Sequence, residues 1–288
     1  MNLHIIKKKG IVLMFAIAAI VNFTSCQPED SFTNNGLTPT TVDASFKVTP
    51  VEGKTNVYNI VAQPKGVLRS IWDTGSGFAD GKMNFEISLP DAGTYTISHK
   101  AIGAGGATAL ATQNIIVATS DPVKGNILKG GRLTNSEDWS KWTVTNPASS
   151  ASITFGSGSA TLTATGWAGN GIYQAINVVA GKKYVIDMLT SSTTGGSNTW
   201  FEVYCGYAAP VTGTDYSEGG KLRALSTWDG CATAAFSGKI SAVGCKAENN
   251  LGIFTATKTG TAYLVIRGGG EDMKAGIKIQ DIEMRLSM

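Results

Sequence analysis

The stretch that decides the fold runs from Gly171 to Tyr184 and reads GIYQAINVVAGKKY. It contains one candidate β-strand, Gly171–Val178, and the beginning of the next, Lys183–Thr190. Short β-rich runs of this kind recur along the chain between segments rich in Gly, Ser and Thr, and long amphipathic helical patterns are absent. The sequence therefore predicts an all-β protein with many turns.

The same pattern extends through the C-terminal part of the chain, from residue 127 to residue 288. About eight candidate strands in about 160 residues fit a jelly-roll β-sandwich. The strands expected here are Ser152–Phe155, Ser159–Ala164, Gly171–Val178, Lys183–Thr190, Trp200–Tyr207, Gly252–Thr255, Thr261–Arg267 and Ile277–Leu286.

The last of these strands predicts a β-bulge. Ile277 and Ile279 alternate on one face, and the apolar alternation resumes at Ile282, one residue out of step. Because successive strand residues face opposite ways, an extra residue at Gln280–Asp281 keeps both apolar sets on one side of the sheet.

Residues 41–119 form a smaller β-rich region that precedes the jelly-roll-like one. Its expected strands are Ser45–Val48, Val57–Ala62, Asn84–Leu89, Thr94–Lys100 and Thr108–Val117. Trp72–Gly77 reads WDTGSG, Asp91–Ile97 reads DAGTYTI, and Ala104–Ala109 fits the hairpin that follows. These motifs resemble those of a PKD domain, and the resemblance implies an immunoglobulin-like β-sandwich that serves as a spacer.

Two residues of this region have both a structural and a functional interpretation, and we favour the structural one for each. Trp72 suits the buried tryptophan of a sandwich core better than a ligand contact. His99 shares a strand face with Tyr95 and Ile97, which suits a partly buried structural histidine. It is also the only histidine after residue 25, so a His-rich zinc site is excluded, and a Ser-His or Cys-His nucleophilic pair would have to use His99.

The N-terminus is typical of a secretory signal peptide that occupies residues 1–25. Lys7–Lys9 precede Ile11–Val21, an apolar run that is too short to span a bilayer as a helix. The residues that end in Cys26 resemble a bacterial lipobox, which implies cleavage before Cys26 and its acylation. The alternative is an ordinary secretory cleavage that leaves Cys26 as a free thiol.

Two further segments complete the predicted domain order. Gln27–Asp30 reads QPED and resembles the short acidic tag that sends Bacteroidetes lipoproteins to the outer cell surface. The polar residues 26–40 are typical of a flexible tether, and residues 120–126, which include Pro122 and Gly125, are typical of a linker. The chain is thus expected to comprise signal peptide 1–25, tether 26–40, PKD-like domain 41–119, linker 120–126 and jelly-roll domain 127–288.

The charge balance argues against a nucleic-acid partner. Residues 1–25 hold three of the 24 basic residues and none of the 21 acidic ones, so the mature chain would be close to neutral. Binding to nucleic-acid phosphates requires a basic surface.

The run Trp200–Tyr207 predicts a core face and a candidate binding face on one strand. The core face comprises Phe201, Val203, Cys205 and Tyr207, and the other face comprises Trp200, Glu202 and Tyr204. Two aromatic rings beside a carboxylate suit a sugar, whose C–H groups stack on the rings while its hydroxyls meet the carboxylate. The alternative is that a loop or the other domain covers this face.

Other aromatic residues lie in turn-like sequence, where side chains often serve recognition. Trp167 lies in the Gly-rich segment Thr165–Gly171, Trp228 lies in Ser226–Gly230, and Tyr216 lies in the long segment 208–220. For Trp167 and Trp228 we favour binding over packing. Of Trp139 and Trp142, at least one is expected in the core, and neither is expected to contact a ligand.

Three cysteines follow Cys26, so one of them must remain unpaired within the chain. Cys205 falls on the core face of its strand and is expected to be a buried free thiol. Cys231 and Cys245 flank Phe236 and a predicted turn at Ser237–Gly238 with hairpin-like spacing, and an oxidising cell surface permits a disulfide between them. That disulfide would stiffen the loop that carries Trp228.

With these residues in view, the chain resembles the SusE- and SusF-like surface glycan-binding lipoproteins of Bacteroidetes. Gly171–Tyr184 looks like the paired strands of a jelly-roll carbohydrate-binding module, and Trp200–Tyr204, Ser226–Cys231 and Ile277–Arg285 extend the likeness. The resemblance implies a non-catalytic, lipid-anchored binder on the outer membrane that faces the cell exterior beside a SusC-like porin and a SusD-like binder. It implies a polysaccharide ligand, with a β-glucan such as laminarin or mixed-linkage glucan favoured, and requires no cofactor.

A structural calcium ion is a further possibility, because jelly-roll modules often carry one. Asp281 beside the predicted bulge is the candidate ligand, together with carbonyl oxygens from the start of the domain. The segment Gly130–Arg132 lacks the acidic residue that the family often supplies there, which weakens the case.

Two other functions stay open at this point. A surface glycoside hydrolase would need two carboxylates about 5 to 10 Å apart, and Glu202 could pair with Asp215, Glu218 or Asp229. An adhesion or structural lipoprotein would bind another protein and no polysaccharide.

Overall fold

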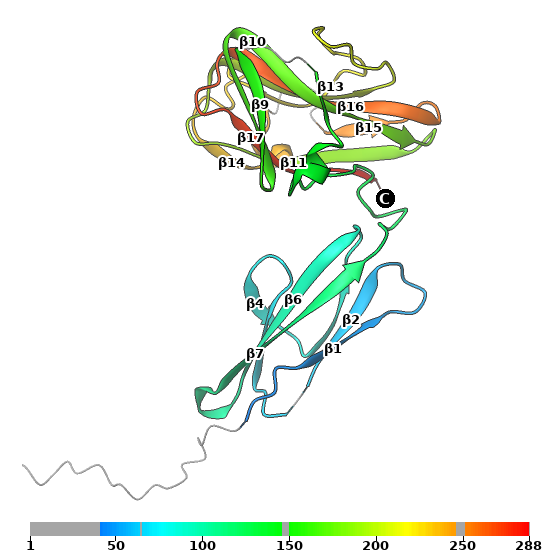
Figure 1. Cartoon of the computed structure of the whole chain (residues 1–288), viewed down its shortest axis with the longest axis vertical. Helices are drawn as coiled ribbons and strands as arrows, with labels where there is room; N and C mark the ends of the chain where they lie inside the picture. The colour runs from blue at the N-terminus through cyan, green and yellow to red at the C-terminus, as the bar shows by residue number, and fades with distance from the viewer. Residues whose placement is uncertain (1–40, 64, 146–149, 246–250, 288) are drawn as a thin grey trace, which may run out of the picture. The chain divides into compact units, whose positions relative to one another are not determined.

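A computed structural model describes residues 41–287 of the chain, apart from residues 64, 146–149 and 246–250 (Figure 1). The predicted signal peptide 1–25, the predicted lipidation site Cys26 and the tether 26–40 lie outside the described residues. Within the described ranges, none of the helices is long and apolar enough to cross a membrane.

Strands dominate the described chain, and the all-β prediction is confirmed. In the N-terminal part the strands are β1 (Phe46–Pro50), β2 (Val57–Ala62), β3 (Arg69–Asp73), β4 (Phe78–Gly81), β5 (Asn84–Ser88), β6 (Gly93–Ile102) and β7 (Thr108–Val117). A single 3-10 turn, η1 (Ala104–Gly106), lies between β6 and β7.

The C-terminal part holds the remaining strands and two single-turn helices, α2 (Ser136–Trp139) and α3 (Ile240–Val243). Its strands are β8 (Thr143–Val144), β9 (Ala151–Gly156), β10 (Ser159–Val178), β11 (Lys183–Ser192), β12 (Ser197–Gly206), β13 (Lys221–Ser226), β14 (Phe236–Lys239), β15 (Ile253–Thr255), β16 (Gly260–Asp272) and β17 (Ile277–Leu286).

The described chain divides into two compact units. Among the described residues, one comprises residues 41–47 with Ile60–Phe85 and Thr96–Gln113, and the other comprises Val48–Asn59, Glu86–Tyr95 and residues 114–287. This division passes through the predicted PKD-like domain, so the boundary expected at residues 120–126 stays a prediction.

The N-terminal strands form two sheets, β1-β2-β5 and β4-β3-β6-β7. Strands β3 and β4 were not expected from the sequence, because each is short: β3 ends inside the WDTGSG motif, and β4 follows the motif directly. In the turn between them, the Asp73 carboxylate accepts hydrogen bonds from the amides of Gly75 and Gly77. This local hydrogen bonding reverses the chain, so two strands of only a few residues can pair.

Trp72 and His99 lie together in the core of this part of the chain, and both structural interpretations are confirmed. The Trp72 indole stacks on the His99 imidazole with ring centroids 4.1 Å apart, and two phenylalanine rings meet its edges. His99 is wholly buried, and its ring nitrogens make hydrogen bonds with the Ala44 carbonyl and the Ser70 hydroxyl. The imidazole therefore has no nitrogen left for chemistry.

The C-terminal strands form one hydrogen-bonded path, β13-β12-β16-β10-β17-β11-β14, with β8 and β9 also on β10 and β15 also on β11. Strand β10 bends between the two halves of this path: its first half pairs with β9 and β17, and its second half pairs with β16 and β8. The core of this part includes Leu162, Ile172, Phe201, Leu264, Ile266 and Ile279.

Three expectations about these strands are wrong. Residues 165–171 are not a loop, because they continue β10 and, apart from the register shift between Thr165 and Ala168, pair with β16. Strands β10 and β11 are not paired with each other, because the C-terminal strand β17 lies between them. Ser237–Gly238 is not a turn, because β14 pairs with the end of β11.

The predicted β-bulge in β17 is confirmed. Leu189 of β11 pairs with Gln280, whereas Asp187 pairs with Glu283, so Asp281 and Ile282 together oppose one residue. Asp281 adopts a positive φ of 47°, which an aspartate tolerates better than most residues. The extra residue directs the isoleucines on both sides of the bulge into the core.

Candidate functional site

The site lies on the outer face of the sheet β13-β12-β16-β10, where glycines make room for Trp200. Register places Trp200 of β12 opposite Gly269 of β16, and Gly269 opposite Gly169 of β10. A Cβ atom at Gly269 would lie 2.9 Å from the Trp200 ring, and one at Gly169 would lie 3.1 Å from it. The indole therefore rests directly on the backbone of two neighbouring strands.

Arg267 covers the same indole from the side of β16. Its guanidinium carbon lies 4.4 Å from the centroid of the Trp200 ring, which is a cation–π contact. The guanidinium also donates hydrogen bonds to the Tyr216 carbonyl (3.0 Å) and to the Asp215 carboxylate (2.8 Å). Arg267 thus connects the tryptophan of the sheet to the segment 208–220.

Trp167 projects into solvent because the backbone of β10 is irregular at this point. The pairing of β10 with β16 shifts between Thr165 and Ala168, and Gly166 and Trp167 both have positive φ values. A bulge of this kind extrudes its side chain, and the Trp167 side chain is 65% exposed. The structure therefore presents Trp167 from a strand bulge rather than from the loop that the glycines predicted.

Trp228 lies beside Trp167 although the two residues are far apart in sequence. Their ring centroids are 6.4 Å apart and their planes differ by 23°, and Trp228 is 55% exposed. Trp228 is held in a tight turn after β13, in which the Gly230 amide donates to the Thr227 carbonyl. Two exposed, nearly parallel indoles at one end of the site form an apolar surface that water solvates poorly.

A disulfide joins Cys231, directly after this turn, to Cys245. The Ser226 amide at the start of the turn lies 3.2 and 3.1 Å from the two sulfur atoms. The bridge therefore braces the segment that carries Trp228. Cys205 is a buried free cysteine, and burial raises the pKa of its thiol above the ordinary value, so it stays protonated.

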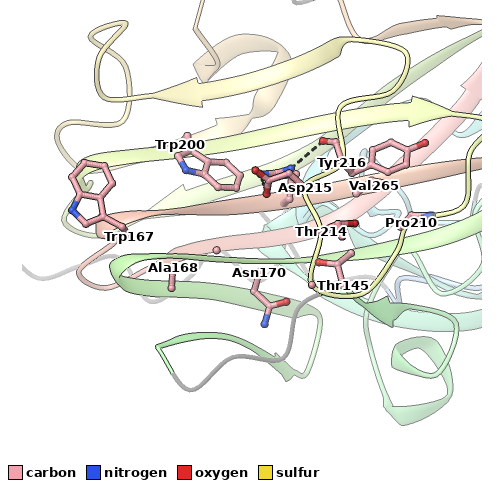
Figure 2. Close-up of a pocket in the computed structure, with 13 residues that line it drawn as sticks. Thr145, Trp167, Ala168, Asn170, Trp200, Pro210, Thr214, Asp215, Tyr216 and Val265 are labelled. Atoms are coloured by element: carbon pink, nitrogen blue, oxygen red, sulfur yellow. Dashed lines mark hydrogen bonds and ion pairs between the residues drawn. The ribbon is translucent and has the colours of Figure 1, made fainter.

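Between these elements lies a pocket of about 350 Å³ (Figure 2). Trp167 and Trp200 lie toward the left of the view, and Thr214, Pro210 and Thr145 lie toward the right. The lining residues are Thr145, Trp167, Ala168, Gly169, Asn170, Trp200, Pro210, Gly213, Thr214, Asp215, Tyr216, Val265 and Arg267. Indole faces beside hydroxyl, amide and guanidinium groups suit a ligand whose surface is part apolar and part hydroxylated.

One wall of the pocket is the segment Ala208–Gly220, which we call the strap. It crosses the sheet face: the Gly213 amide donates to the Thr145 carbonyl, and Arg267 holds Tyr216 and Asp215. The Glu218 carboxylate ties the base of the strap by accepting hydrogen bonds from the Ala208 amide and the Tyr216 hydroxyl. The loss of some hydration raises the pKa of the exposed Glu218 carboxylate, but hydrogen bonds from the backbone amides of Ala208 and Tyr207 outweigh this and lower the pKa below its ordinary value.

The strap covers Tyr204, so the expectation of an exposed Tyr204 platform is wrong. The Tyr204 side chain is only 6% exposed and packs in a small cluster with Tyr216 and Val265. Burial raises the pKa of both tyrosines, and neighbouring carboxylates raise it further. Both phenols therefore stay neutral, and their hydroxyls act as hydrogen-bond donors within the chain.

Glu202 is also differently placed from what the sequence suggested. Its carboxylate accepts a hydrogen bond from the Tyr204 hydroxyl at 2.7 Å and lies 3.6 Å from the ammonium group of Lys221. It is not among the residues that line the pocket. Of the face Trp200, Glu202 and Tyr204, only Trp200 lines the pocket, and the alternative of a covering loop holds for Tyr204.

Several residues of the pocket were not predicted as site residues, namely Arg267, Asn170 and Thr145. Arg267 was placed at the end of a candidate strand, and its alternation with the buried Ile266 could have assigned it to the outer face. Asn170 and Thr145 gave no such signal, because only the pairing of β8 and β16 with β10 brings them to the site.

The remaining predicted residues lie away from the pocket. Trp142 is buried in the core and Trp139 packs against it, as expected. Asp281 lies at the bulge of β17, where the Gly131 carbonyl accepts a hydrogen bond from the Ile282 amide, and a structural calcium ion there stays a prediction. In the part of the chain that the structure describes, no group of three or more His, Cys, Asp or Glu residues gathers to hold a metal.

No protein-family model matches the chain, and no curated protein matches it either. Among solved structures it is similar to carbohydrate-binding modules of the β-sandwich superfamily described for promiscuous specificity, with 14% identity, a TM-score of 0.31, and 84% of this chain and 97% of that chain covered. It is also similar to a CBM4 module, with 12% identity, a TM-score of 0.33, and 56% and 99% covered.

A third similar structure is the enzymatically active domain of bacteriophage CBA120 tailspike protein 4, with 13% identity and a TM-score of 0.37. That match covers 60% of this chain and only 23% of the tailspike chain.

Proposed function

We propose that the protein is a non-catalytic polysaccharide binder and that the pocket beside Trp200 holds part of a glycan chain. The single observation that carries the proposal is the grouping of three indoles from distant parts of the sequence at one end of a polar pocket. Trp167, Trp200 and Trp228 come from β10, β12 and the turn after β13. An exposed pair of indoles costs apolar hydration unless a ligand covers it.

The chemistry of the pocket suits a sugar ring. Axial C–H groups would stack on the indoles, while the Asn170 amide, the hydroxyls of Thr145 and Thr214 and the strap would meet the sugar hydroxyls. One stacked ring contributes on the order of 1 kcal/mol, so each site would be weak. Several copies on one surface that hold one long polymer would gain avidity.

We further propose a β-glucan such as laminarin or mixed-linkage glucan as the ligand, and a lipid anchor at Cys26 that holds the protein on the outer membrane. The support is the resemblance of the sequence to surface glycan-binding lipoproteins that act beside SusC-like and SusD-like partners. In this proposal the N-terminal β-sandwich is a spacer and the C-terminal one is the binding module.

The number of carboxylates in the pocket bears on the alternative function, which is glycoside hydrolysis. Among the described residues that line the pocket, Asp215 is the one residue with a carboxylate, and this carboxylate forms an ion pair with Arg267. Most glycoside hydrolases use two carboxyl groups that flank the scissile bond. Binding therefore fits the pocket better than hydrolysis.

The test is affinity electrophoresis of the mature protein in gels that contain laminarin, mixed-linkage glucan, xyloglucan, starch or no glycan. Trp167→Ala and Trp228→Ala are run beside the wild type, with Trp139→Phe as a control outside the pocket. Chromatography of each glucan after incubation with the protein reports hydrolysis.

We expect retardation by a β-glucan that both alanine variants weaken and Trp139→Phe retains. Release of oligosaccharides would establish the hydrolase instead. Retardation that the alanine variants leave unchanged would refute this site, and no retardation by any polysaccharide would favour a protein partner.

A further inference from the structure

The pocket contains an ion pair whose two members differ greatly in their exposure. The Arg267 side chain is 13% exposed, whereas the Asp215 side chain is 93% exposed, and their charged atoms are 2.8 Å apart. Arg267 is held on its other sides by the Trp200 ring and the Tyr216 carbonyl. The cation is therefore fixed in the wall of the site, and the carboxylate reaches it from solvent.

The guanidinium donates from Nη1 to the Tyr216 carbonyl and from Nη2 to the Asp215 carboxylate, so its charge is paired with Asp215. A guanidinium next to an aromatic ring in a glycan site is a ready partner for the carboxylate of a uronic acid. With Asp215 in place, the charge of the Arg267 guanidinium is already neutralised. The carboxylate of an acidic sugar would therefore gain little attraction from Arg267 and would be repelled by the Asp215 carboxylate. The affinity for a neutral sugar does not depend on a free positive charge, so the pairing of Asp215 with Arg267 does not lower it.

We propose that Asp215 is a specificity-determining residue that makes the pocket select neutral glycan units over units bearing a carboxylate. This inference rests on the proposed glycan-binding function of the same site. Asp215 acts by occupying Arg267, and its removal leaves an uncompensated guanidinium where the ligand lies. The preference of the pocket then moves toward anionic sugars.

The ion pair is suited to this role because Asp215 contributes little to the fold. An ion pair with one fully solvated partner stabilises a protein by at most about 1 kcal/mol. Arg267 keeps its contacts with the ring and the Tyr216 carbonyl when the carboxylate is removed. Asp215→Asn therefore changes the charge of the site and preserves the size of the side chain.

The experiment compares two polymers with one backbone. Mixed-linkage β-glucan is used as it is and after oxidation of a fraction of its C6 hydroxymethyl groups to carboxylates, which gives glucuronate units. The measured quantity is the ratio of affinity for the oxidised polymer to affinity for the neutral one. The proteins are wild type, Asp215→Asn, Arg267→Gln, the double variant, and Asp281→Asn, which removes one exposed charge from β17.

We expect the ratio to rise at least fivefold in Asp215→Asn at low salt, to fall back in the double variant, and to stay at the wild-type value in Asp281→Asn. Added salt should reduce the gain, because it screens the new attraction. An unchanged ratio in Asp215→Asn overturns the inference, as does a wild-type protein that already prefers the oxidised polymer. A gain that persists in the double variant also overturns it.

Binding by wild type tests the proposed function, and the comparison of Asp215→Asn with the double variant tests the role of Asp215. If wild type binds neither polymer, the β-glucan proposal fails. Asp215→Asn then still decides the inference, because binding of the oxidised polymer by this variant and not by the double variant would support it. Thermal melting of all five proteins establishes that each is folded.

Discussion

Gly169 and Gly269, on which the Trp200 indole rests, allow a quantitative prediction. In Gly269→Ala, the new Cβ would lie 2.5 Å from the Ala168 carbonyl oxygen, 2.7 Å from the Gly169 Cα and 2.9 Å from the Trp200 ring. Two of these atoms belong to the backbone of β10, so the strands must separate or the indole must rise. The φ of Gly269 is not in the left-handed region, so the effect is one of space alone.

Overpacking of this kind costs about 1 to 3 kcal/mol. A domain of this size loses about 2 to 4 °C in melting temperature for each kcal/mol, so we expect a fall of about 2 to 12 °C. Because Trp200 would be displaced, affinity for the bound glycan should also fall about fivefold, the equivalent of one stacked ring.

Differential scanning calorimetry and affinity electrophoresis measure the two effects on the same protein. Gly156→Ala in β9 is the matched control, because the nearest atom to its Cβ would be 3.8 Å away. The control should change stability by less than about 0.5 kcal/mol. If Gly269→Ala retained both the melting temperature and the affinity of wild type, the close packing of Trp200 on Gly169 and Gly269 would be refuted.

Three further predictions concern stability. Replacing both Cys231 and Cys245 by serine should lower the free energy of unfolding by about 3 kcal/mol, because the unfolded chain regains the entropy that it loses when the bridge closes a loop of about 15 residues; urea titration without reductant measures this. Trp72→Ala should cost about 3 to 5 kcal/mol because it empties the N-terminal core, and an unchanged melting temperature would contradict that packing. Glu218→Gln should cost at most about 1 kcal/mol at neutral pH, because the carboxylate is exposed. The lowered pKa of Glu218 means that this contribution is complete above about pH 4.3 and disappears as the pH falls through the folded value, so wild type and variant should converge in acid.

The sequence was sufficient where alternation and burial coincide. The out-of-step isoleucines of β17 predicted a bulge that the pairing with β11 contains. The alternation in Trp200–Tyr207 correctly assigned Phe201, Val203 and Cys205 to the core. In both cases one strand carried the whole signal, and no knowledge of its neighbours was needed.

The site could be predicted only in part, because it depends on which strands are neighbours. Glycines at residues 166, 169 and 171 predicted a loop, yet in β10 Gly169 faces Gly269, Gly171 faces Arg267, and Gly166 lies in the bulge beside Trp167. Tyr204 was assigned to the correct face, but nothing in its own strand showed that Tyr216 would cover it. Arg267 became recognisable only when the structure placed it over Trp200.

Isothermal titration of the mature protein with mixed-linkage glucan and laminarin shows whether the three indoles bind a glycan. Wild type should release measurable heat with at least one of them. Trp167→Ala and Trp200→Ala should each weaken binding about fivefold, and the double variant should show no saturable heat, while all variants keep a cooperative thermal transition. Wild-type affinity in the double variant would contradict glycan binding by the indoles.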